Sequence, residues 1–305
     1  MATLVEQGVE PKLAAREVAA LARSPAVAVA KAYAERVRRY ELAVRLREEH
    51  SRLLPLVDRV DGPLTLEQLR RAVALARPFL IPGFASSWPS ASWTWPELRA
   101  RFGDGDVEVS AGRDGHERPD VRYQDTAVRM RFDAFLDKVV ADGSSNDVYL
   151  VAHNRALAEP LLAPLLGDLR FPEVPGVERN LHLWLGPRGT VTPLHHDRVD
   201  ILFVQILGRK RFHVVDGMNR RLLKDCLTYW VDHDLGNPPD DVPVTTFEVG
   251  PGDALFLPCG TWHQVTSLDP ALSISTTSLG TPNEFGWYEP GGTSSGPPPK
   301  VTRPA

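Results

Sequence analysis

The apolar and polar residues of this chain follow two different periods, and the change between them separates two kinds of structure. Over residues 11–54, apolar positions recur at helical spacing with arginines between them, and Pro25 suits the first turn of a helix. From about Asp147 onward, short apolar stretches are separated by turns rich in Gly, Pro and Asp. The first pattern predicts helices, and the second predicts the strands of an antiparallel sandwich or barrel.

The strands expected in the second region are short and closely spaced. They are VYLVA, LHLWLG, ILFVQIL, RFHVV, TFEV, ALFLP, WHQVTSL and LSISTTS. Between the two regions, the pattern predicts helices over residues 64–76 and 132–140, a buried strand PFLI that ends before Pro82, and a strand over residues 107–112. The predicted fold class is therefore mostly β with helical additions.

The same patterns divide the chain into three parts. Residues 1–60 are expected to form an N-terminal helical region, and residues 61–288 the main domain. Residues 289–305 are rich in Pro, Gly and Ser, and we expect this tail to be disordered. The long helix of the first region either packs on the main domain or pairs with a second copy, which would make a homodimer. Its apolar face is formed by Val29, Tyr33, Val37 and Tyr40.

Composition narrows the function classes. The 305 residues carry a formal net charge of −4, so the basic excess of a nucleic-acid-binding protein is missing. No apolar run approaches the roughly 20 residues that span a bilayer, and the N-terminus lacks the pattern of a secretory signal. Two cysteines do not make a disulfide framework. We therefore expect a cytoplasmic protein that binds neither nucleic acid nor membrane.

The segment HLWLGPRGTVTPLHHDRVD contains a candidate metal site. In an extended backbone, His195 and Asp197 point to the same side and His196 to the other. His263 follows Asp197 by 66 residues, a span that holds enough strands for the chain to return beside the first two ligands. Two imidazoles and one carboxylate make a facial triad suited to Fe(II), although affinity alone does not choose iron over Mn, Co or Zn. The alternative is that these are three unrelated polar residues, because an H-x-D motif by itself is common.

Five blocks of the chain resemble the JmjC-related, cupin-like 2-oxoglutarate oxygenases, a group similar to asparaginyl and arginyl hydroxylases. The blocks are ARPFLIPGFASSWP, NDVYLVAHN, WLGPRGTVTPLHHD, QILGRKRFHVV and PGDALFLPCGTWHQVTSL, and the resemblance that rests on them spans roughly residues 77–280. The resemblance implies a double-stranded β-helix, a jelly roll flanked by helices. It also implies that His195, Asp197 and His263 hold Fe(II), and that 2-oxoglutarate is the cosubstrate.

The resemblance further implies that Lys210 forms an ion pair with the distal carboxylate of 2-oxoglutarate. Strand alternation agrees, because it places Lys210 on the same face as the apolar Phe212 and Val214. The alternative is a solvent-facing lysine on an edge strand. Thr192 and Tyr149 match a hydroxyl and a phenol that reach the same carboxylate. Their alternatives are a threonine at a strand end and a core aromatic residue with its hydroxyl at the rim.

Two positions depart from the family pattern. Relatives often carry Asn four residues after the Asp ligand, where this chain has Ile201, and another Asn on the last strand, where we expect Ser278. The metal-proximal carboxylate of 2-oxoglutarate is therefore expected to be held in a different way here.

The resemblance implies hydroxylation of an unactivated C–H bond, and a protein or peptide side chain is the substrate class that we favour. A small-molecule substrate, a metal-dependent cupin enzyme without 2-oxoglutarate, and a non-catalytic binding module are the alternatives. Lys210 and Thr192 argue against the second, and an intact triad argues against the third. Histone demethylation is not expected, because the sequence has no recognisable chromatin-reading module. The acidic segment 216–247 is expected either to line the mouth of the site or to be a solvated loop.

Overall fold

The structure is a computed structural model, and it describes residues 2–171, 180–225 and 229–279. The chain divides into two compact units, one up to Leu53 and one from Leu54 onward. The first unit is helical and consists of α1 (Ala2–Glu6), α2 (Pro11–Ala22) and α3 (Pro25–Leu53). Helices were expected over residues 11–54, and α2 and α3 confirm them. The tail from residue 289 lies outside the described residues.

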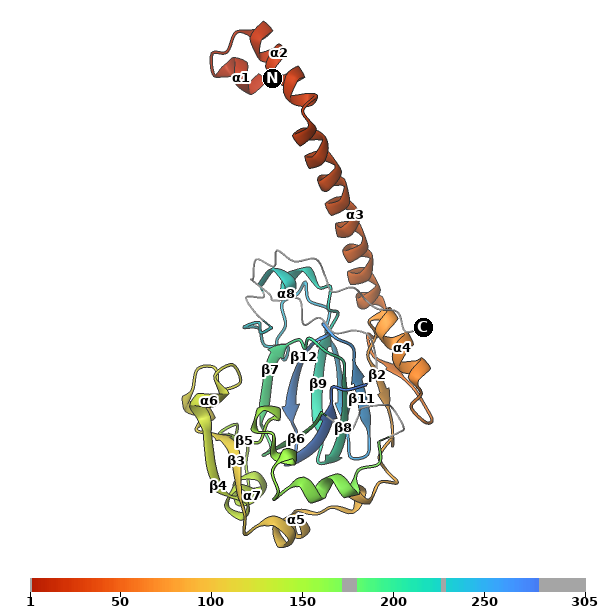
Figure 1. Cartoon of the computed structure of the whole chain (residues 1–305), viewed down its shortest axis with the longest axis vertical. Coiled ribbons are helices and arrows are strands. Elements are labelled where there is room, and N and C mark those ends of the chain that lie inside the picture. The colour runs from red at the N-terminus through yellow and green to blue at the C-terminus, as the bar shows by residue number, and fades with distance from the viewer. Residues whose placement is uncertain (1, 172–179, 226–228, 280–305) are drawn as a thin grey trace. The chain divides into compact units, whose positions relative to one another are not determined.

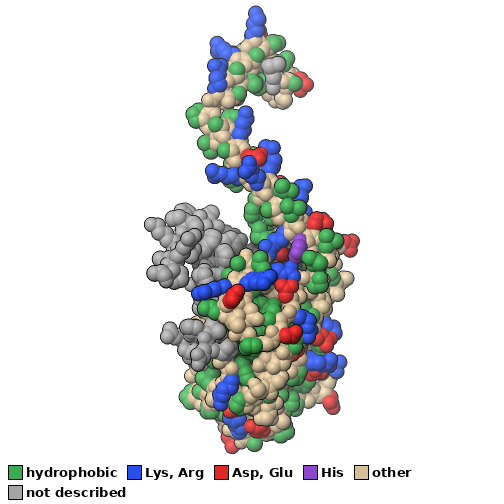
Figure 2. Space-filling model, turned by 90° about the vertical axis from the view of Figure 1, so that its right-hand side faces the viewer, with side chains coloured by type: hydrophobic (Ala, Val, Ile, Leu, Met, Phe, Trp, Pro, Cys, Tyr) green, Lys and Arg blue, Asp and Glu red, His purple; other side chains and the backbone are tan. Residues whose placement is uncertain are grey.

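Prolines and a cap explain where these helices begin. Pro11 and Pro25 each occupy the first turn, where the missing N–H group costs no helical hydrogen bond. The Glu10 carboxylate accepts hydrogen bonds from the backbone N–H groups of Lys12 and Leu13, which caps α2. Along the helical unit, apolar side chains alternate with Lys and Arg (Figure 2).

Two sheets face each other in the second unit and form the expected double-stranded β-helix (Figure 1). They are antiparallel except where β1 pairs with β2 in parallel. The six-stranded sheet has the order β1-β2-β11-β8-β13-β6, and the four-stranded sheet has the order β10-β9-β12-β7. The strands of the larger sheet are β1 (Asp58–Arg59), β2 (Phe79–Ile81), β6 (Leu181–Gly186), β8 (Ile201–Leu207), β11 (Ala254–Leu257) and β13 (Ala271–Thr276). Those of the smaller are β7 (Val191–His195), β9 (Lys210–Val215), β10 (Thr245–Val249) and β12 (Trp262–Ser267).

A third sheet lies beside the barrel edge at β6 and β7 (Figure 1). This small sheet has the order β4-β3-β5 and consists of β3 (Asp106–Ala111), β4 (Ala127–Arg131) and β5 (Val148–Tyr149). The helices of the second unit are α4 (Leu66–Leu75), α5 (Trp95–Phe102), α6 (Tyr123–Thr126), α7 (Phe132–Val140) and α8 (Arg220–Asp225). A bridge between Leu150 and Leu185 links the end of β5 to β6. The small sheet is thereby attached to the barrel next to the candidate site.

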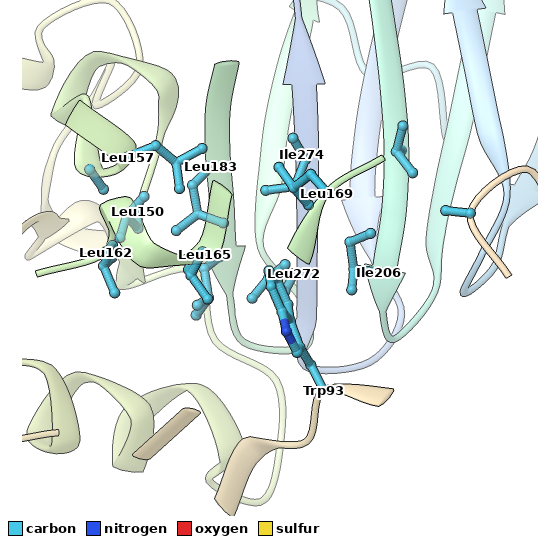
Figure 3. Close-up of a cluster of buried hydrophobic side chains, with 14 of the residues drawn as sticks. Trp93, Leu150, Leu157, Leu162, Leu165, Leu169, Leu183, Ile206, Leu272 and Ile274 are labelled. Atoms are coloured by element: carbon cyan, nitrogen blue, oxygen red, sulfur yellow. The ribbon is translucent and has the colours of Figure 1, made fainter. Parts of the chain in front are cut away.

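The main hydrophobic core lies against one face of the six-stranded sheet. Figure 3 shows leucines of the segment that follows β5 packed on side chains from β6, β8 and β13. The labelled members are Trp93, Leu150, Leu157, Leu162, Leu165, Leu169, Leu183, Ile206, Leu272 and Ile274. Side chains alternate along a strand, so the intervening residues of these strands point to the other face, into the barrel. The interior of the barrel is thus left for the candidate site.

The structure corrects the expectation for Ser278. β13 ends at Thr276, so Ser278 lies beyond the last strand, where its backbone N–H donates to the Thr276 hydroxyl. The residue of β13 that lines the pocket is Ser275. The run SISTTS remains polar and β-branched past the true strand end, which is why the pattern placed the strand too far along the chain.

Candidate metal centre and adjoining pocket

The three predicted metal ligands come together because β7 pairs with β12. His195 ends β7 and lies opposite His263 of β12 in the antiparallel register. Asp197 follows two residues after the strand. Its Oδ2 atom is 3.8 Å from Nε2 of His195 and 3.5 Å from Nε2 of His263. One ligand atom from each residue lies within 4.8 Å of the others.

Backbone carbonyls fix the orientation of both imidazoles. Nδ1 of His195 is 2.8 Å from the carbonyl oxygen of Pro193, and Nδ1 of His263 is 3.0 Å from that of Thr261. A carbonyl only accepts, so each Nδ1 carries the proton and donates it. Each Nε2 is then left with a lone pair that faces Asp197. Such a second hydrogen bond is how proteins hold histidine ligands ready for a metal.

The chemistry of this donor set fits a divalent cation. Oδ2 of Asp197 is buried and, within the described chain, has no hydrogen-bond partner. Burial lowers the pKa of His263 to about 4, so this imidazole is neutral at neutral pH. With both imidazoles in the neutral form that metal binding requires, their Nε2 atoms and the buried carboxylate oxygen of Asp197 converge on one point. Burying such acceptors is costly unless a cation compensates them, and two His with one carboxylate suit Fe(II).

His196 lies on the opposite side of the chain from the ligands, as alternation predicts. Its ring packs edge-on against Trp262, with ring centroids 4.5 Å apart, and its backbone N–H donates to the carbonyl of Tyr229. Burial lowers its pKa, so the ring is neutral. His196 therefore has a structural role in packing the strand and does not face the metal centre.

A pocket opens from the metal centre into the barrel. It is lined by Tyr149, Trp184, Thr192, His195, Asp197, Ile201, Phe203, Lys210, Phe212, Leu257, His263, Val265 and Ser275. The structure thus brings all six predicted site residues to one pocket. Most of the remaining lining is apolar or aromatic, which keeps water away from the polar groups.

Lys210 is buried in this pocket without an anion. Only 1% of the residue is exposed, and Nζ lies 3.3 Å from the Tyr149 hydroxyl. Over the described residues, no carboxylate is within ion-pair distance of it. Burial lowers the pKa of the Lys210 ammonium to about 7. A buried ammonium without a counter-ion is strongly disfavoured, so this end of the pocket is built to receive an anion.

Tyr149 and Thr192 stand beside this lysine. The Thr192 side chain hydrogen-bonds the Tyr149 phenol, and burial raises the pKa of Tyr149 to about 12. The phenol therefore stays protonated and can donate a hydrogen bond at any physiological pH. Lys210 pairs with Ser267, four residues along β12 from His263, so the polar end and the metal ligands are separated by about 13 Å of strand.

The comparison with known proteins agrees with this geometry. Residues 65–277 match the family model of the cupin-like domain. The chain belongs to this family. The cupin-like domain holds both the triad and Lys210, and it confirms the predicted fold class and family.

Named relatives of this cupin-like domain carry JmjC or demethylase names. Lysine-specific demethylase 8 of Danio rerio is 26% identical over 219 residues, which cover 65% of this chain and 52% of that protein. Lysine-specific demethylase JMJ30 of Arabidopsis thaliana is 28% identical over 239 residues, or 70% and 52%. JmjC domain-containing protein C of Dictyostelium discoideum is 32% identical over 130 residues, or 36% and 31%. The chain spans about half the length, or less, of these relatives. The cofactors of this class are Fe(II) and 2-oxoglutarate.

Sequence reasoning missed Trp184 and Ser275, two polar residues that line the cupin-like pocket. Trp184 on β6 donates a hydrogen bond from Nε1 to the Ser275 hydroxyl on β13, at 2.8 Å. Ile201 begins β8 and also lines this part of the pocket, so an apolar side chain does stand where relatives often have Asn. The alternation of LHLWLG could have placed Trp184 on the inner face. The pairing of β6 with β13 could not be read from the sequence.

The acidic segment 216–247 reaches the metal centre through an aromatic residue. Trp230 stacks on the ring of His195, with centroids 4.7 Å apart, and forms a β-bridge with the same residue. Further along, the backbone N–H of Leu235 donates to the side chain of Gln264, the neighbour of His263. The segment therefore packs against residues of the site and is not a wholly solvated loop. Residues 226–228 within it lie outside the described residues.

No helix among the described residues is long and apolar enough to cross a membrane. The cytoplasmic location and the absence of nucleic-acid partners stay predictions.

Proposed function

We propose that this protein is an Fe(II)- and 2-oxoglutarate-dependent dioxygenase that hydroxylates an unactivated C–H bond, on a protein or peptide side chain. One observation carries the proposal: the triad of His195, Asp197 and His263 lines the same pocket as Lys210, a buried lysine with no carboxylate in ion-pair distance among the described residues. When bound, the metal with 2-oxoglutarate and dioxygen supplies the oxidising chemistry, which releases succinate and carbon dioxide and places one oxygen atom in the substrate. The protein supplies orientation and a dry cavity.

Different residues of this chain would bind the metal and the distal carboxylate of the cosubstrate. His195, Asp197 and His263 would hold the metal, and three protein ligands would leave room for the cosubstrate and oxygen. Lys210 neutralises the distal carboxylate of 2-oxoglutarate, while the hydroxyl groups of Tyr149 and Thr192 donate to the same group. The apolar lining excludes water, so these charge contacts are stronger than they would be in solvent.

The polar end of the pocket disfavours a cupin enzyme that uses the metal alone. Such a reaction gives no reason to bury Lys210 beside Tyr149, because a lysine there costs free energy until an anion arrives. A small-molecule substrate uses the same chemistry and is separated from a peptide only by experiment.

Demethylation of methyl-lysine is the second candidate, and the names of two relatives favour it. It follows from the same first step, because a hydroxylated N-methyl group breaks down to formaldehyde and the free amine. Hydroxylation requires only that first step, so we place it first.

Cosubstrate use is tested by measuring succinate formed from 2-oxoglutarate with Fe(II) and ascorbate, with an Asp197→Ala variant as the control. We expect succinate from the native protein only. A protein that binds the metal but neither binds nor consumes 2-oxoglutarate would overturn the proposed use of this cosubstrate.

The substrate is sought by mass spectrometry of peptides from cells with the active protein or the Asp197→Ala variant. Hydroxylation adds one oxygen atom to a peptide, whereas demethylation removes a methyl group and releases formaldehyde. A product found only among small metabolites would favour the small-molecule alternative.

A further inference from the structure

A buried arginine of the small sheet lies behind the polar end of the pocket. Arg113 follows β3, and its side chain is fully buried. Nη2 donates to the Asp120 carboxylate at 2.9 Å and to the carbonyl of Val191 at 3.2 Å, and Nε donates to the carbonyl of Asn146 at 3.1 Å. The guanidinium thus connects three separate segments of the chain.

Stability alone does not explain this ion pair. Desolvation by burial raises the pKa of Asp120 despite the neighbouring guanidinium, so the carboxylate is held at a cost. Nη1 of Arg113 is also buried and, among the described residues, has no hydrogen-bond partner. Buried pairs of this kind contribute little net stability compared with apolar residues of the same size. An explanation must come from what the guanidinium holds in place.

Arg113 contacts the surroundings of both hydroxyl residues at the distal end. Its Cζ lies 5.3 Å from the centroid of the Tyr149 ring, and Lys210 Nζ lies 5.5 Å from the same centroid. The Val191 carbonyl that it binds belongs to the residue before Thr192, and the Val191 N–H donates to the Asn146 side chain at 3.0 Å. One guanidinium therefore restrains the tyrosine ring and the start of β7.

We propose that Arg113, held by Asp120, is a positioning residue for the distal carboxylate of 2-oxoglutarate. It fixes the Tyr149 phenol and the Thr192 hydroxyl at the separation that the carboxylate requires, and it touches neither the cosubstrate nor the metal ligands. This inference rests on the proposed function. Preorganised donors bind more tightly because their ordering cost is met before the ligand arrives.

The test compares the binding of 2-oxoglutarate, which reaches the distal end of the pocket, with that of oxalate, which does not. 2-Oxoglutarate and oxalate are each titrated calorimetrically into the Mn(II)-loaded full-length protein. Both ligands can chelate the metal, but only 2-oxoglutarate reaches the distal end. For Arg113→Met we expect the dissociation constant of 2-oxoglutarate to rise about tenfold or more, as for the loss of a charge-assisted hydrogen bond, with that of oxalate and of Mn(II) changed by less than about twofold.

Two further variants keep the test decisive. Arg113→Lys keeps the charge beside Asp120 but cannot reach Val191 and stack on Tyr149 together, so it is expected to fold and still to weaken 2-oxoglutarate selectively. Arg129→Met is the matched control, because Arg129 of β4 forms an ion pair with Glu159 and neither residue lines the pocket. It is expected to leave both ligands unchanged.

The outcomes are distinct. Equal weakening of oxalate and 2-oxoglutarate in Arg113→Lys would mean general damage and overturn the positioning role, as would unchanged binding of both. A native protein that binds oxalate but not 2-oxoglutarate would overturn the proposed function and this inference together. Selective weakening of 2-oxoglutarate supports both.

Discussion

Two imidazole lone pairs and one buried carboxylate oxygen meet at the mouth of the pocket, and each is needed to hold a cation on one face. We expect His195→Ala, Asp197→Ala or His263→Ala each to abolish iron binding and turnover, because the two remaining ligands cannot fix the metal. Metal content by mass spectrometry and succinate release measure the two effects.

The matched control is His213→Ala, a histidine of β9 that hydrogen-bonds the Thr246 hydroxyl away from the site. It should keep one equivalent of iron. Near-normal activity of any ligand variant with iron still bound would show that the triad is wrong.

Lys210 is the residue on which recognition of the distal carboxylate depends. Lys210→Ala should keep the metal but weaken 2-oxoglutarate by on the order of 3–5 kcal/mol, because the carboxylate would be desolvated without its partner. The neighbouring Arg211 pairs with Glu248 on the outer surface, so Arg211→Ala serves as the control. The Michaelis constant for 2-oxoglutarate is the readout, and an unchanged value would mean that another cation holds the dicarboxylate.

The depressed pKa of Lys210 also predicts how stability changes with pH. In the ligand-free protein this pKa is about 7, against 10.5 for an exposed lysine, so above pH 7 the folded state binds fewer protons than the unfolded state. Burying the charged ammonium destabilises the folded state most below pH 7, and this destabilisation decreases as the pH rises and the folded protein loses the proton. Stability should therefore gain about 1.4 kcal/mol per pH unit from this group between pH 7 and 9.

Urea unfolding of the native protein and of Lys210→Met at several pH values isolates this contribution. The difference in unfolding free energy between the two proteins should change with pH in that window, and saturating 2-oxoglutarate should remove the change by keeping the lysine protonated. Parallel pH curves for the two proteins without ligand would contradict the prediction.

At the scale of elements, the strands with clear alternation or continuous apolar runs were predictable, and irregular ones were not. In β9, Lys210 and Phe212 are buried while Arg211 is exposed, as the period of two requires. The pattern does not predict β7, because VTPLH contains a proline and has too few residues to show a period. The pattern also does not predict β4, because the side chains of AVRMR are mostly exposed and show no apolar alternation. The strand forms through its antiparallel pairing with β3.

The binding partner of the long helix α3 stays a prediction. Val29, Tyr33 and Val37 are exposed on it. We expect this face to pair with a second copy in a homodimer, because burying such side chains contributes roughly 1.5–3 kcal/mol each. Light scattering of the full chain, and of a shortened chain starting at Leu56, measures the mass.

A variant with Tyr33→Glu and Val37→Glu should be monomeric if the face forms the contact. Arg38→Glu is its control, because Arg38 is exposed on the opposite face of the same helix. If the native chain is already a monomer, the homodimer is excluded, and the packed-helix alternative is left.

At the scale of the whole molecule, some residues of the candidate site could be predicted from the sequence and others could not. The ligands and Lys210 stand in blocks that resemble a family, so their positions could be carried over. Arg113 stands in no such block, and its partners Asp120, Asn146 and Val191 lie 7, 33 and 78 residues away. Contacts of that kind depend on how the small sheet meets the barrel, which no local pattern encodes.

The backbone hydrogen bonds of β7 would restrict how a polypeptide substrate can bind. The Val191 N–H and carbonyl are taken by Asn146 and Arg113, the Leu194 carbonyl by Val231, and the His196 N–H by Tyr229. Among the described residues, the backbone groups named here leave no free edge on this strand for an incoming strand to extend. If the proposed function is correct, a peptide would have to insert the side chain of its target residue alone. Selectivity would then come from the shape and charge of one residue and its neighbours, and folded proteins with a protruding loop are as eligible as extended chains.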